Sequence, residues 1–443
     1  MQDLTPKVYL QTYGCQMNKL DSEVMLGLLA KEGYRCVGRP EEADVILYNT
    51  CSVREHAEDK VWSELGFLRA LKKEHPEKIL GITGCMAQNV KELVFKRAPH
   101  VDLVVGTGEE HRIAELIEGI RQGERQTLAV EIDHGRAPDP AVFQTTQRGS
   151  QVKAWVEIMA GCDQMCAYCV VPFTRGRERS RPARDILDEV KGLADRGFKE
   201  VTLLGQNVNA YGQDLGGEED FAELLHQLNQ RSAISRIRFL TSHPNNATSR
   251  LAQVMAEAER VCEHLHLPVQ TGSDRILKLM NRGYTVDDYR SLVDEFRSAV
   301  PGISITTDLI VGFPTETEEE FAMTLDLVRE LEFDSAFLFK YSPRKGTAAY
   351  WMRDDVEEEI KKRRHQEILA LVQEISLRKH RAQEGSEVEI LVERHARKGP
   401  QTWVGRARDF RKVVFRGEGS YLGRFVNVRI TEGRVDHLLG TPQ

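Results

Sequence analysis

Three cysteines stand close together in the stretch AGCDQMCAYCVVP, at Cys162, Cys166 and Cys169. Their C-x3-C-x2-C spacing lets one tight loop bring three thiolates onto a single metal centre. A structural zinc site usually has four protein ligands, whereas a cubane iron–sulfur cluster held by three cysteines keeps one iron open to a small ligand. The spacing therefore favours an iron–sulfur cluster. The alternative is a zinc knuckle with a distant fourth ligand, such as His243 or His264.

A second group of cysteines is spread along the chain, at Cys15, Cys51 and Cys85. Each follows an apolar, strand-like run, and strands of one parallel sheet share the edge formed by their carboxyl ends. Three distant thiols can therefore meet there. Clustered thiolates without charge compensation are costly, which favours a second metal centre over three separate buried cysteines. The two remaining cysteines, Cys36 and Cys262, have no partner at motif spacing and are interpreted as structural.

The elements around the second group alternate between strand and helix. The expected strands are 7–14, 43–50, 78–84 and 101–106, and the expected helices are 21–33, 54–74 and 89–99. This alternation predicts an α/β domain with a parallel sheet and helices on its faces. Residues 121–150 are polar and contain two prolines close together, so we interpret them as a boundary between domains.

Six further strand–helix units are expected around the group of Cys162, Cys166 and Cys169. The expected strands are 153–160, 199–205, 236–242, 263–269, 304–312 and 335–342, and the helices between them include 184–197, 221–230, 286–300 and 319–331. Six units predict a partial (β/α)6 barrel, shorter than the eight units of a complete one. A charged helix over 355–382 follows, and then short strands at 387–395, 403–410, 412–419 and 425–431, which predict a small β-barrel.

Charge and composition limit the classes of function. The chain has 443 residues and a formal net charge of −7, so a nucleic-acid surface must be local. Residues 391–443 supply one, with 11 Lys and Arg against 5 Asp and Glu. The N-terminus has no signal-peptide pattern and no apolar run is long enough to span a membrane, so a cytoplasmic location is expected.

The cysteine loop, with Tyr168 before its last cysteine, resembles that of the radical S-adenosylmethionine (SAM) enzymes. Over essentially the whole chain, one subfamily is similar, the methylthiotransferases. The similar stretches are TYGCQMN, YNTCSVRE, GCMAQ, TRGRERSRP, LLGQNVNAYG, HLPVQTGSD, MNRGYT and DLIVGFP. The resemblance implies a methylthiotransferase N-terminal domain at 6–122, a radical SAM core at 148–380 and a TRAM-like RNA-binding domain at 383–443.

The resemblance also implies the activity. CQMN, after the first strand, is most similar to the branch that methylthiolates C2 of N6-isopentenyladenosine beside the anticodon of tRNA. Two [4Fe-4S] clusters would be bound, one by Cys162, Cys166 and Cys169 together with SAM, and an auxiliary one by Cys15, Cys51 and Cys85 that holds sulfur for transfer. An electron donor such as flavodoxin or ferredoxin and a sulfur source are implied partners. The alternatives are a branch acting on threonylcarbamoyl-adenosine tRNA or a ribosomal protein, and a non-catalytic RNA-binding Fe–S or zinc protein.

Candidate ligands for SAM and RNA follow from position. The resemblance places the SAM amino group near Gln206 or Asn207, and strand ends at the same barrel mouth carry Gln270, Ser273 and Asp308. Arginines suit the SAM carboxylate or RNA phosphates. The basic candidates in the stretch TRGRERSRP are Arg175, Arg177 and Arg179. In the C-terminal tail, residues 391–443, where aromatic residues are interleaved, they are Arg406, Arg408, Arg411 and Lys412. No catalytic side chain is assigned.

Overall fold

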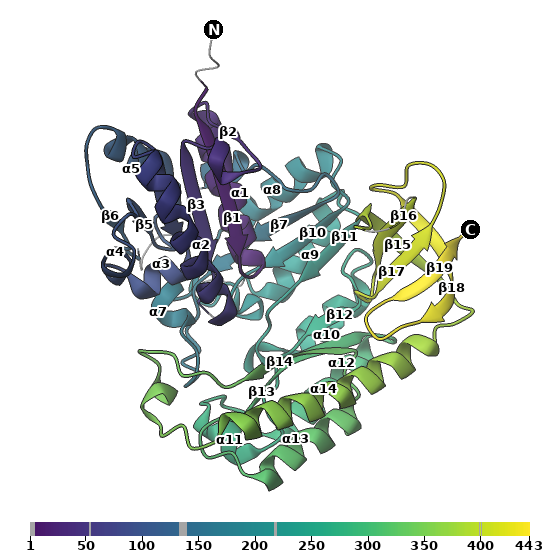
Figure 1. Ribbon diagram of the computed structural model, residues 1–443. Helices are drawn as coiled ribbons and strands as arrows, with labels where there is room; N and C mark the ends of the chain where they lie inside the picture. Colours follow the sequence, from purple (N-terminus) through teal and green to yellow (C-terminus); the bar gives the residue numbers. More distant parts are fainter. Residues whose placement is uncertain (1–4, 53–54, 133–139, 217–218, 398, 400) are drawn as a thin grey trace. The chain divides into compact units, whose positions relative to one another are not determined.

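The computed structural model describes residues 5–52, 55–132, 140–216, 219–397, 399 and 401–443 (Figure 1). This part of the chain divides into two compact units. The first consists of Met1–Gly149, Met159–Asp163 and Cys169–Arg181, and the second of Ser150–Ile158, Gln164–Tyr168 and Pro182–Gln443. The predicted α/β class is confirmed, since each unit contains parallel strands connected by helices.

A six-stranded sheet, in which every neighbouring pair is parallel, forms the centre of the first unit. The order across the sheet is β2-β1-β3-β4-β5-β6. The strands are β1 (Lys7–Tyr13), β2 (Arg35–Cys36), β3 (Val45–Thr50), β4 (Ile79–Thr83), β5 (Leu103–Val105) and β6 (Thr127–Ala129). The four predicted strands are confirmed. Edge strands β2 and β6 were not predicted, because runs of two and three residues carry no readable periodicity.

Helices cover both faces of this sheet, and each face has its own core. The helices are α1 (Gln16–Lys31), α2 (Glu55–Glu74), α3 (Cys85–Val90), α4 (Leu93–Arg97), α5 (Ile113–Arg121) and α6 (Pro140–Gln144). Met25 of α1 and Ile117 of α5 pack in one core with Val45 of β3. On the other face, Leu65 of α2 packs in a second core with Ile82 of β4. Central strands buried on both faces explain their uninterrupted apolar runs.

The structure corrects three expected segments of this unit. The first helix begins at Gln16 instead of residue 21, so that Cys15 is its N-cap. The helix predicted over 89–99 is replaced by α3 and α4, because Lys91 between them has a left-handed φ of 51°. The expected boundary at 121–150 contains β6 and α6. Arg54, at the start of another predicted helix, and residues 133–139 lie outside the described residues.

Six parallel strands of the second unit form two three-stranded sheets, in the orders β11-β10-β7 and β12-β13-β14. An isolated parallel bridge between Ile237 and Val261 joins them into one arc. The strands are β7 (Lys153–Glu157), β10 (Glu200–Leu204), β11 (Arg236–Phe239), β12 (His264–His266), β13 (Ser304–Val311) and β14 (Ser335–Lys340). This confirms the predicted partial barrel, which stays open because β14 does not pair with β7.

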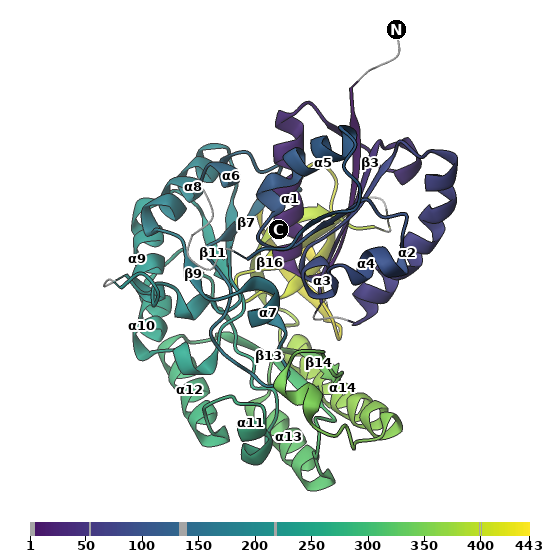
Figure 2. The same cartoon turned by 90° about the vertical axis from the view of Figure 1, so that its left-hand side faces the viewer.

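The helices of the second unit lie along the outer face of this arc (Figure 2). They are α8 (Ala183–Asp195), α9 (Phe221–Arg231), α10 (Ser249–Glu257), α11 (Asp274–Leu279), α12 (Val286–Ala299), α13 (Glu318–Leu331) and α14 (Glu358–Arg381). The short elements β8 (Met159–Ala160), β9 (Arg179–Ser180) and α7 (Val171–Arg175) belong to the first unit instead. None of the helices described here is long and apolar enough to cross a membrane.

A closed five-stranded barrel ends the chain, with strand order β15-β16-β17-β19-β18. Its strands are β15 (Glu387–His395), β16 (Thr402–Ala407), β17 (Lys412–Arg416), β18 (Phe425–Gly433) and β19 (Leu438–Pro442). The predicted small β-barrel is confirmed, with β19 as an additional strand. Two buried arginines of β11 hold it to the partial barrel: Arg236 donates to the carbonyl oxygen of Arg406 (2.8 Å), and Arg238 donates to that of Ala407 (2.7 Å).

Candidate functional site

The second cysteine group lies at one edge of the six-stranded sheet. Strands β1, β3 and β4 are neighbours, and the paired residues Tyr13 and Thr50 place the ends of β1 and β3 level with each other. Cys15, Cys51 and Cys85 follow the carboxyl ends of β1, β3 and β4, respectively. The sheet therefore brings three thiols, 36 and 34 residues apart in sequence, to the same edge.

Glycines allow the backbone to pack tightly around these thiols. A Cβ atom on Gly14 would lie 2.4 Å from Oδ1 of Asn18 and 2.9 Å from Cβ of Cys51. Gly84 has a φ of 86°, and a Cβ there would lie 2.2 Å from Oδ1 of Asn49. At both positions the neighbouring groups leave no space for a side chain, and at Gly84 the positive φ favours glycine as well. The small residues before the cysteines are thus explained by close approach.

An asparagine pair stabilises the first turn of α1 beside Cys15. Asn18 is fully buried, and its Oδ1 accepts a hydrogen bond from the backbone N–H of Cys15 at 3.3 Å. Its Nδ2 donates to Oδ1 of Asn49 at 3.1 Å, and Asn49 donates to the carbonyl oxygen of Asn18 at 2.8 Å. The last residue of the CQMN stretch is therefore part of the support of the cysteine edge.

The surroundings of this edge favour the thiolate form of Cys15. A hydrogen bond with Cys51 lowers the pKa of Cys15 to about 6, and the nearby positive charge of Arg175 acts in the same direction. Burial raises the pKa of Cys85, although Arg175 lies close to it as well. Arg175 also forms a buried ion pair with Asp21 of α1, at 2.5 Å. A guanidinium beside thiols is suited to compensate the negative charge of a thiolate-bound metal centre.

The donor set at this edge fits a cubane cluster better than a single ion. Among residues that the structure describes, no group of three or more His, Cys, Asp or Glu side chains converges on one metal ion. A cubane cluster needs no such convergence, because each cysteine binds a different iron. Three thiols, a buried cation and no carboxylate among the ligands suit an iron–sulfur cluster with one open iron.

The cysteine loop 162–169 follows β8, and its members have different surroundings. Cys162 is buried, and its backbone N–H donates to the carbonyl oxygen of Gly176 at 3.1 Å in the first unit. Cys166 is also buried, and in the second unit its Sγ accepts a hydrogen bond from Nη1 of Arg282 at 3.2 Å. Cys169 is partly exposed. Three thiols on so short a loop fit one cluster, as their spacing predicts.

Arg282 brings a buried positive charge to Cys166 without a carboxylate beside it. Its side chain donates to Cys166, to the hydroxyl groups of Tyr168 (3.5 Å) and Tyr284 (2.9 Å) and to the carbonyl oxygen of Pro268 (3.0 Å). In the described part of the chain it forms no salt bridge, and only 4% of it is exposed. A buried charge needs a counter-charge. Thiolates bound to a cluster would supply it.

The strand ends of the partial barrel carry polar groups that the protein leaves without a partner. His243, after β11, is buried, and its Nδ1 accepts a hydrogen bond from the backbone N–H of Asn245 at 3.2 Å. Burial, together with the charge of Arg282, lowers the pKa of His243 to about 3. The ring is therefore neutral with its proton on Nε2, and this donor has no acceptor among the described residues, like the nearby Ser242 Oγ. Both groups fit a polar ligand such as SAM.

The predicted SAM ligands have varied surroundings at this mouth. Asn207 is buried and donates to Oδ1 of Asn246 at 3.0 Å, while Gln206 is half-buried. Gln270 is buried with a left-handed φ of 79°. Asp308 lies 3.3 Å from Nε2 of His266. Ser273 caps α11 and donates to Glu320 at 2.9 Å, so its hydroxyl already has structural partners. His264, an alternative zinc ligand, is stacked on Phe410 and contacts Thr306.

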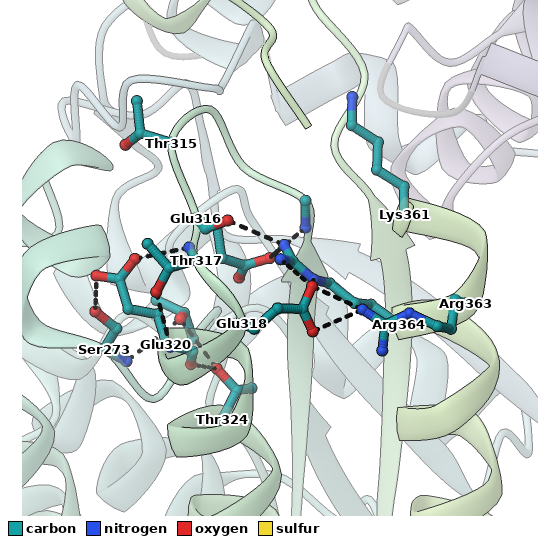
Figure 3. A network of polar contacts seen from close by, with 12 residues as sticks. Ser273, Thr315, Glu316, Thr317, Glu318, Glu320, Thr324, Lys361, Arg363 and Arg364 are labelled. Carbon is teal, nitrogen blue, oxygen red and sulfur yellow. Dashed lines mark hydrogen bonds and ion pairs between the residues drawn. The ribbon is translucent and has the colours of Figure 1, made fainter. Parts of the chain in front are cut away.

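Two carboxylates after β13, only four residues apart, each contact an arginine, but their pKa values are shifted in opposite directions (Figure 3). Glu320 accepts hydrogen bonds from Arg275, Ser273 and the backbone N–H of Thr317, and the contact with Arg275 contributes most to lowering its pKa to about 2. Glu316 is more deeply enclosed. Its Oε2 accepts from the backbone N–H of Gly312 (2.6 Å) and from Arg364 (2.8 Å), but burial prevails and raises its pKa to about 7.

Glu316 should make the stability of the protein depend on pH. Its pKa rises from 4.5 to about 7 on folding, so its contribution is complete below pH 4.5 and is lost as the pH rises through 7. Glu316→Gln removes this dependence. We compare the free energies of unfolding of wild type and variant by urea denaturation. The value for wild type, relative to that for the variant, should decrease by roughly 2–3 kcal/mol as the pH is raised from 5 to 8. Glu259→Gln, at an exposed position, is the control. A difference that does not change with pH would contradict the assignment.

The predicted RNA-binding arginines mostly have partners within the protein. Arg177 is exposed and forms a bidentate pair with Asp163, and Arg179 donates to the carbonyl oxygen of Arg175 at 3.5 Å. In the tail, Arg408 pairs with Glu263 (2.6 Å) and Arg411 with Asp334 (3.1 Å). The other two have partners in the C-terminal barrel: Arg406 donates to the carbonyl oxygen of Phe410, and Lys412 pairs with Asp436. The contacts of Arg408 and Arg411 hold the C-terminal barrel to the partial barrel, a role that the local basic charge did not indicate.

Sequence reasoning named Arg175 but missed its pairing with Asp21, and it missed other buried charges altogether. The Asp21–Arg175 pair, Arg282 and the Glu316–Arg364 pair all join residues that are far apart in sequence. The available signal was indirect. Arg175 and Arg282 belong to TRGRERSRP and MNRGYT, two of the stretches on which the family resemblance depends.

Comparison with known proteins agrees with this architecture. The Radical SAM superfamily model matches residues 156–328, a model described as uncharacterized protein family UPF0004 matches residues 7–106, and the TRAM domain model matches residues 381–442. In fold, the chain is similar to the radical S-adenosylmethionine methyltransferase TsrM from Kitasatospora setae, with a TM-score of 0.56 and 18% identity over 76% of this chain and 75% of that one. The protein is a radical SAM enzyme, and SAM and [4Fe-4S] clusters are its cofactors.

Two relatives narrow the class further. A tRNA-2-methylthio-N(6)-dimethylallyladenosine synthase from Geobacillus thermodenitrificans is 47% identical over 98% of this chain and 83% of its own length. The enzyme of the same name from Carboxydothermus hydrogenoformans is 46% identical over 98% of both chains. The chain belongs to the family of tRNA-2-methylthio-N(6)-dimethylallyladenosine synthases.

Proposed function

We propose that this enzyme transfers a methylthio group to C2 of N6-isopentenyladenosine beside the anticodon of tRNA, giving 2-methylthio-N6-isopentenyladenosine. The observation that carries the proposal is the convergence of Cys15, Cys51 and Cys85 at one sheet edge, in a chain that also has the Cys162–Cys169 loop. A radical SAM enzyme that only abstracts hydrogen needs one cluster. A second three-cysteine site supplies a place to hold the sulfur that is transferred.

Each cysteine group has its own role in this function. Cys162, Cys166 and Cys169 would hold the cluster beside which SAM binds, and this pair of cofactors would supply one-electron cleavage of SAM to a 5′-deoxyadenosyl radical. Cys15, Cys51 and Cys85 bind the auxiliary cluster. Arg175 and Asp21 orient the first turn of α1 and balance charge at that edge, and Arg282 does so at Cys166. Gln206, Asn207, Gln270, Asp308 and Arg175 remain candidate SAM ligands, and His243 Nε2 and Ser242 Oγ join them, because neither has a hydrogen-bond partner among the residues that the structure describes.

The proposal includes partners that the chain does not contain. An electron donor of the flavodoxin or ferredoxin type reduces the SAM cluster, and a separate sulfur source replenishes the auxiliary one. tRNA as substrate implies a cytoplasmic location. The basic residues Arg177, Arg179, Arg406, Arg408, Arg411 and Lys412 remain candidates for RNA contact where their internal partners leave donors available.

Analysis of tRNA nucleosides by mass spectrometry tests the function directly. A strain that lacks this chain should accumulate N6-isopentenyladenosine and lose its 2-methylthio derivative. Wild-type chain should restore the product, and Cys51→Ala should not, because it removes one auxiliary ligand. Persistence of the methylthio nucleoside in the deletion strain would refute the substrate. Loss of methylthiolated threonylcarbamoyl-adenosine would identify the alternative tRNA branch instead.

A further inference from the structure

An exposed aromatic pair lies outside both cysteine groups. Tyr350 and Trp351 end the 3-10 helix Ala348–Trp351, which follows β14. Trp351 is 80% exposed and Tyr350 39% exposed, and their ring centroids are 5.3 Å apart with planes at 87°. Large aromatic side chains contribute most when they are buried, so a tryptophan left in water suggests a binding surface. We call Tyr350 and Trp351 the aromatic ledge.

The ledge is held by a rigid base beside the SAM-cluster loop. Ala349 is fully buried and packs in a cluster with Phe313, Tyr341 and Ala167. Its backbone N–H donates to the carbonyl oxygen of Ala167 at 2.7 Å, and its own carbonyl oxygen accepts from the Tyr341 hydroxyl at 2.8 Å. Ala167 follows Cys166 in the cysteine loop. The backbone that carries the two rings is thus anchored, through Ala349, to the cysteine loop.

Positive charge flanks the ledge on both sides in sequence. Lys345 and Arg353 are exposed, and neither forms a salt bridge within the part of the chain that the structure describes. The neighbouring acidic groups have partners: Asp354 pairs with Lys361 at 2.7 Å, and Asp355 accepts from the backbone N–H of Thr315 at 2.7 Å. Exposed cations that flank two exposed aromatic residues in sequence are a combination suited to single-stranded nucleic acid, which offers phosphates for contact and bases for stacking.

We infer that the aromatic ledge binds unpaired bases of the RNA loop that presents the target adenosine, with Lys345 and Arg353 on the adjoining phosphates. This inference deepens the proposed function and rests on it. An acidic protein, such as an electron donor, could also be drawn to the two cations. Two exposed aromatic rings on a backbone anchored to the cysteine loop favour a planar base, because every base can stack on them irrespective of its hydrogen-bonding edge.

Direct binding measurements test the ledge. The reconstituted full chain is titrated with a fluorescent RNA stem-loop that carries N6-isopentenyladenosine in an anticodon-type loop. Trp351→Ala should weaken binding roughly 5- to 100-fold, the loss expected for one base–aromatic stack. Trp351→Phe keeps a ring and should stay within a few-fold of wild type. Lys345→Gln should lower the slope of log Kd against log salt by about one phosphate contact.

Phe67→Ala is the matched control, because Phe67 is 78% exposed on α2 and belongs to no proposed site. A second measurement needs no substitution: 4-thiouridine in the RNA loop should crosslink wild type within residues 344–353. The inference would be overturned if Trp351→Ala kept the wild-type affinity for the RNA, or if crosslinks formed only elsewhere. It would also be overturned if Trp351→Ala impaired only the reduction of the enzyme by a protein electron donor. Failure of wild type to bind this RNA would instead refute the proposed function.

Discussion

Replacement of Cys166 by alanine should reduce the rate of 5′-deoxyadenosine release from SAM more than about a thousandfold relative to wild type. On the proposed assignment, Cys162, Cys166 and Cys169 hold the cluster that binds SAM, so removal of one would leave an iron without its protein ligand and the cluster would be lost. Anaerobically reconstituted wild type should contain about eight irons per chain, and Cys166→Ala about four. The measurements are chromatography of the nucleoside after reduction and an iron assay of the same sample.

Cys262→Ala is the control for this prediction, because Cys262 is also buried but belongs to neither group. It should keep both the iron content and the nucleoside release. The reciprocal variant, Cys51→Ala, should lose the auxiliary irons and still release 5′-deoxyadenosine. Zinc in place of iron in wild type, or release by Cys166→Ala at the wild-type rate, would contradict the two-cluster assignment.

Arg282→Gln should make the SAM cluster harder to reduce. The Arg282 guanidinium is buried, lies 3.2 Å from Cys166 Sγ and has no carboxylate partner among the described residues. A nearby positive charge stabilises the more negative, reduced cluster. Its removal should lower the midpoint potential by an amount on the order of 2–3 kcal/mol, roughly 100 mV for one electron.

A redox titration followed by electron paramagnetic resonance measures this shift. Cys15, Cys51 and Cys85 are replaced by alanine, so that only the SAM cluster contributes to the signal. Arg282→Lys keeps the charge and should shift the potential less than Arg282→Gln. Arg275→Gln is the matched control, since Arg275 lies on α11, is half exposed and pairs with Glu320 instead of a cysteine. An unchanged potential in Arg282→Gln at full iron content would show that the guanidinium acts only on structure.

Much of the fold could be predicted from local sequence pattern. The interior strands β3 and β4 are buried throughout and mostly apolar, because helices cover both faces of the sheet, and such runs can be recognised from the sequence alone. Boundaries were less accurate. The helix break at Lys91 depends on a left-handed φ that a lysine gives no reason to expect, and the early start of α1 depends on Cys15 and Asn18 acting as its cap.

Contacts between distant residues could not be predicted in this way. The tail arginines illustrate the reason: a local excess of positive charge indicates phosphate binding, but Arg408 and Arg411 find Glu263 and Asp334, more than 70 residues away in sequence. Likewise, the sequence MNRGYT does not reveal that Arg282 reaches Cys166, 116 residues earlier. Both depend on which surfaces the fold brings together.

By itself, the sequence determined the ligand chemistry and the frame that holds it. Thiol spacing indicates the SAM cluster because ligands within one loop are close whatever the rest of the chain does, and strand–helix alternation places Cys15, Cys51 and Cys85 at one edge because parallel strands share an edge. Only the tertiary structure decided the charges and surfaces around those ligands. Arg175, Arg282 and the aromatic ledge owe their positions to burial and long-range packing, which local pattern does not encode.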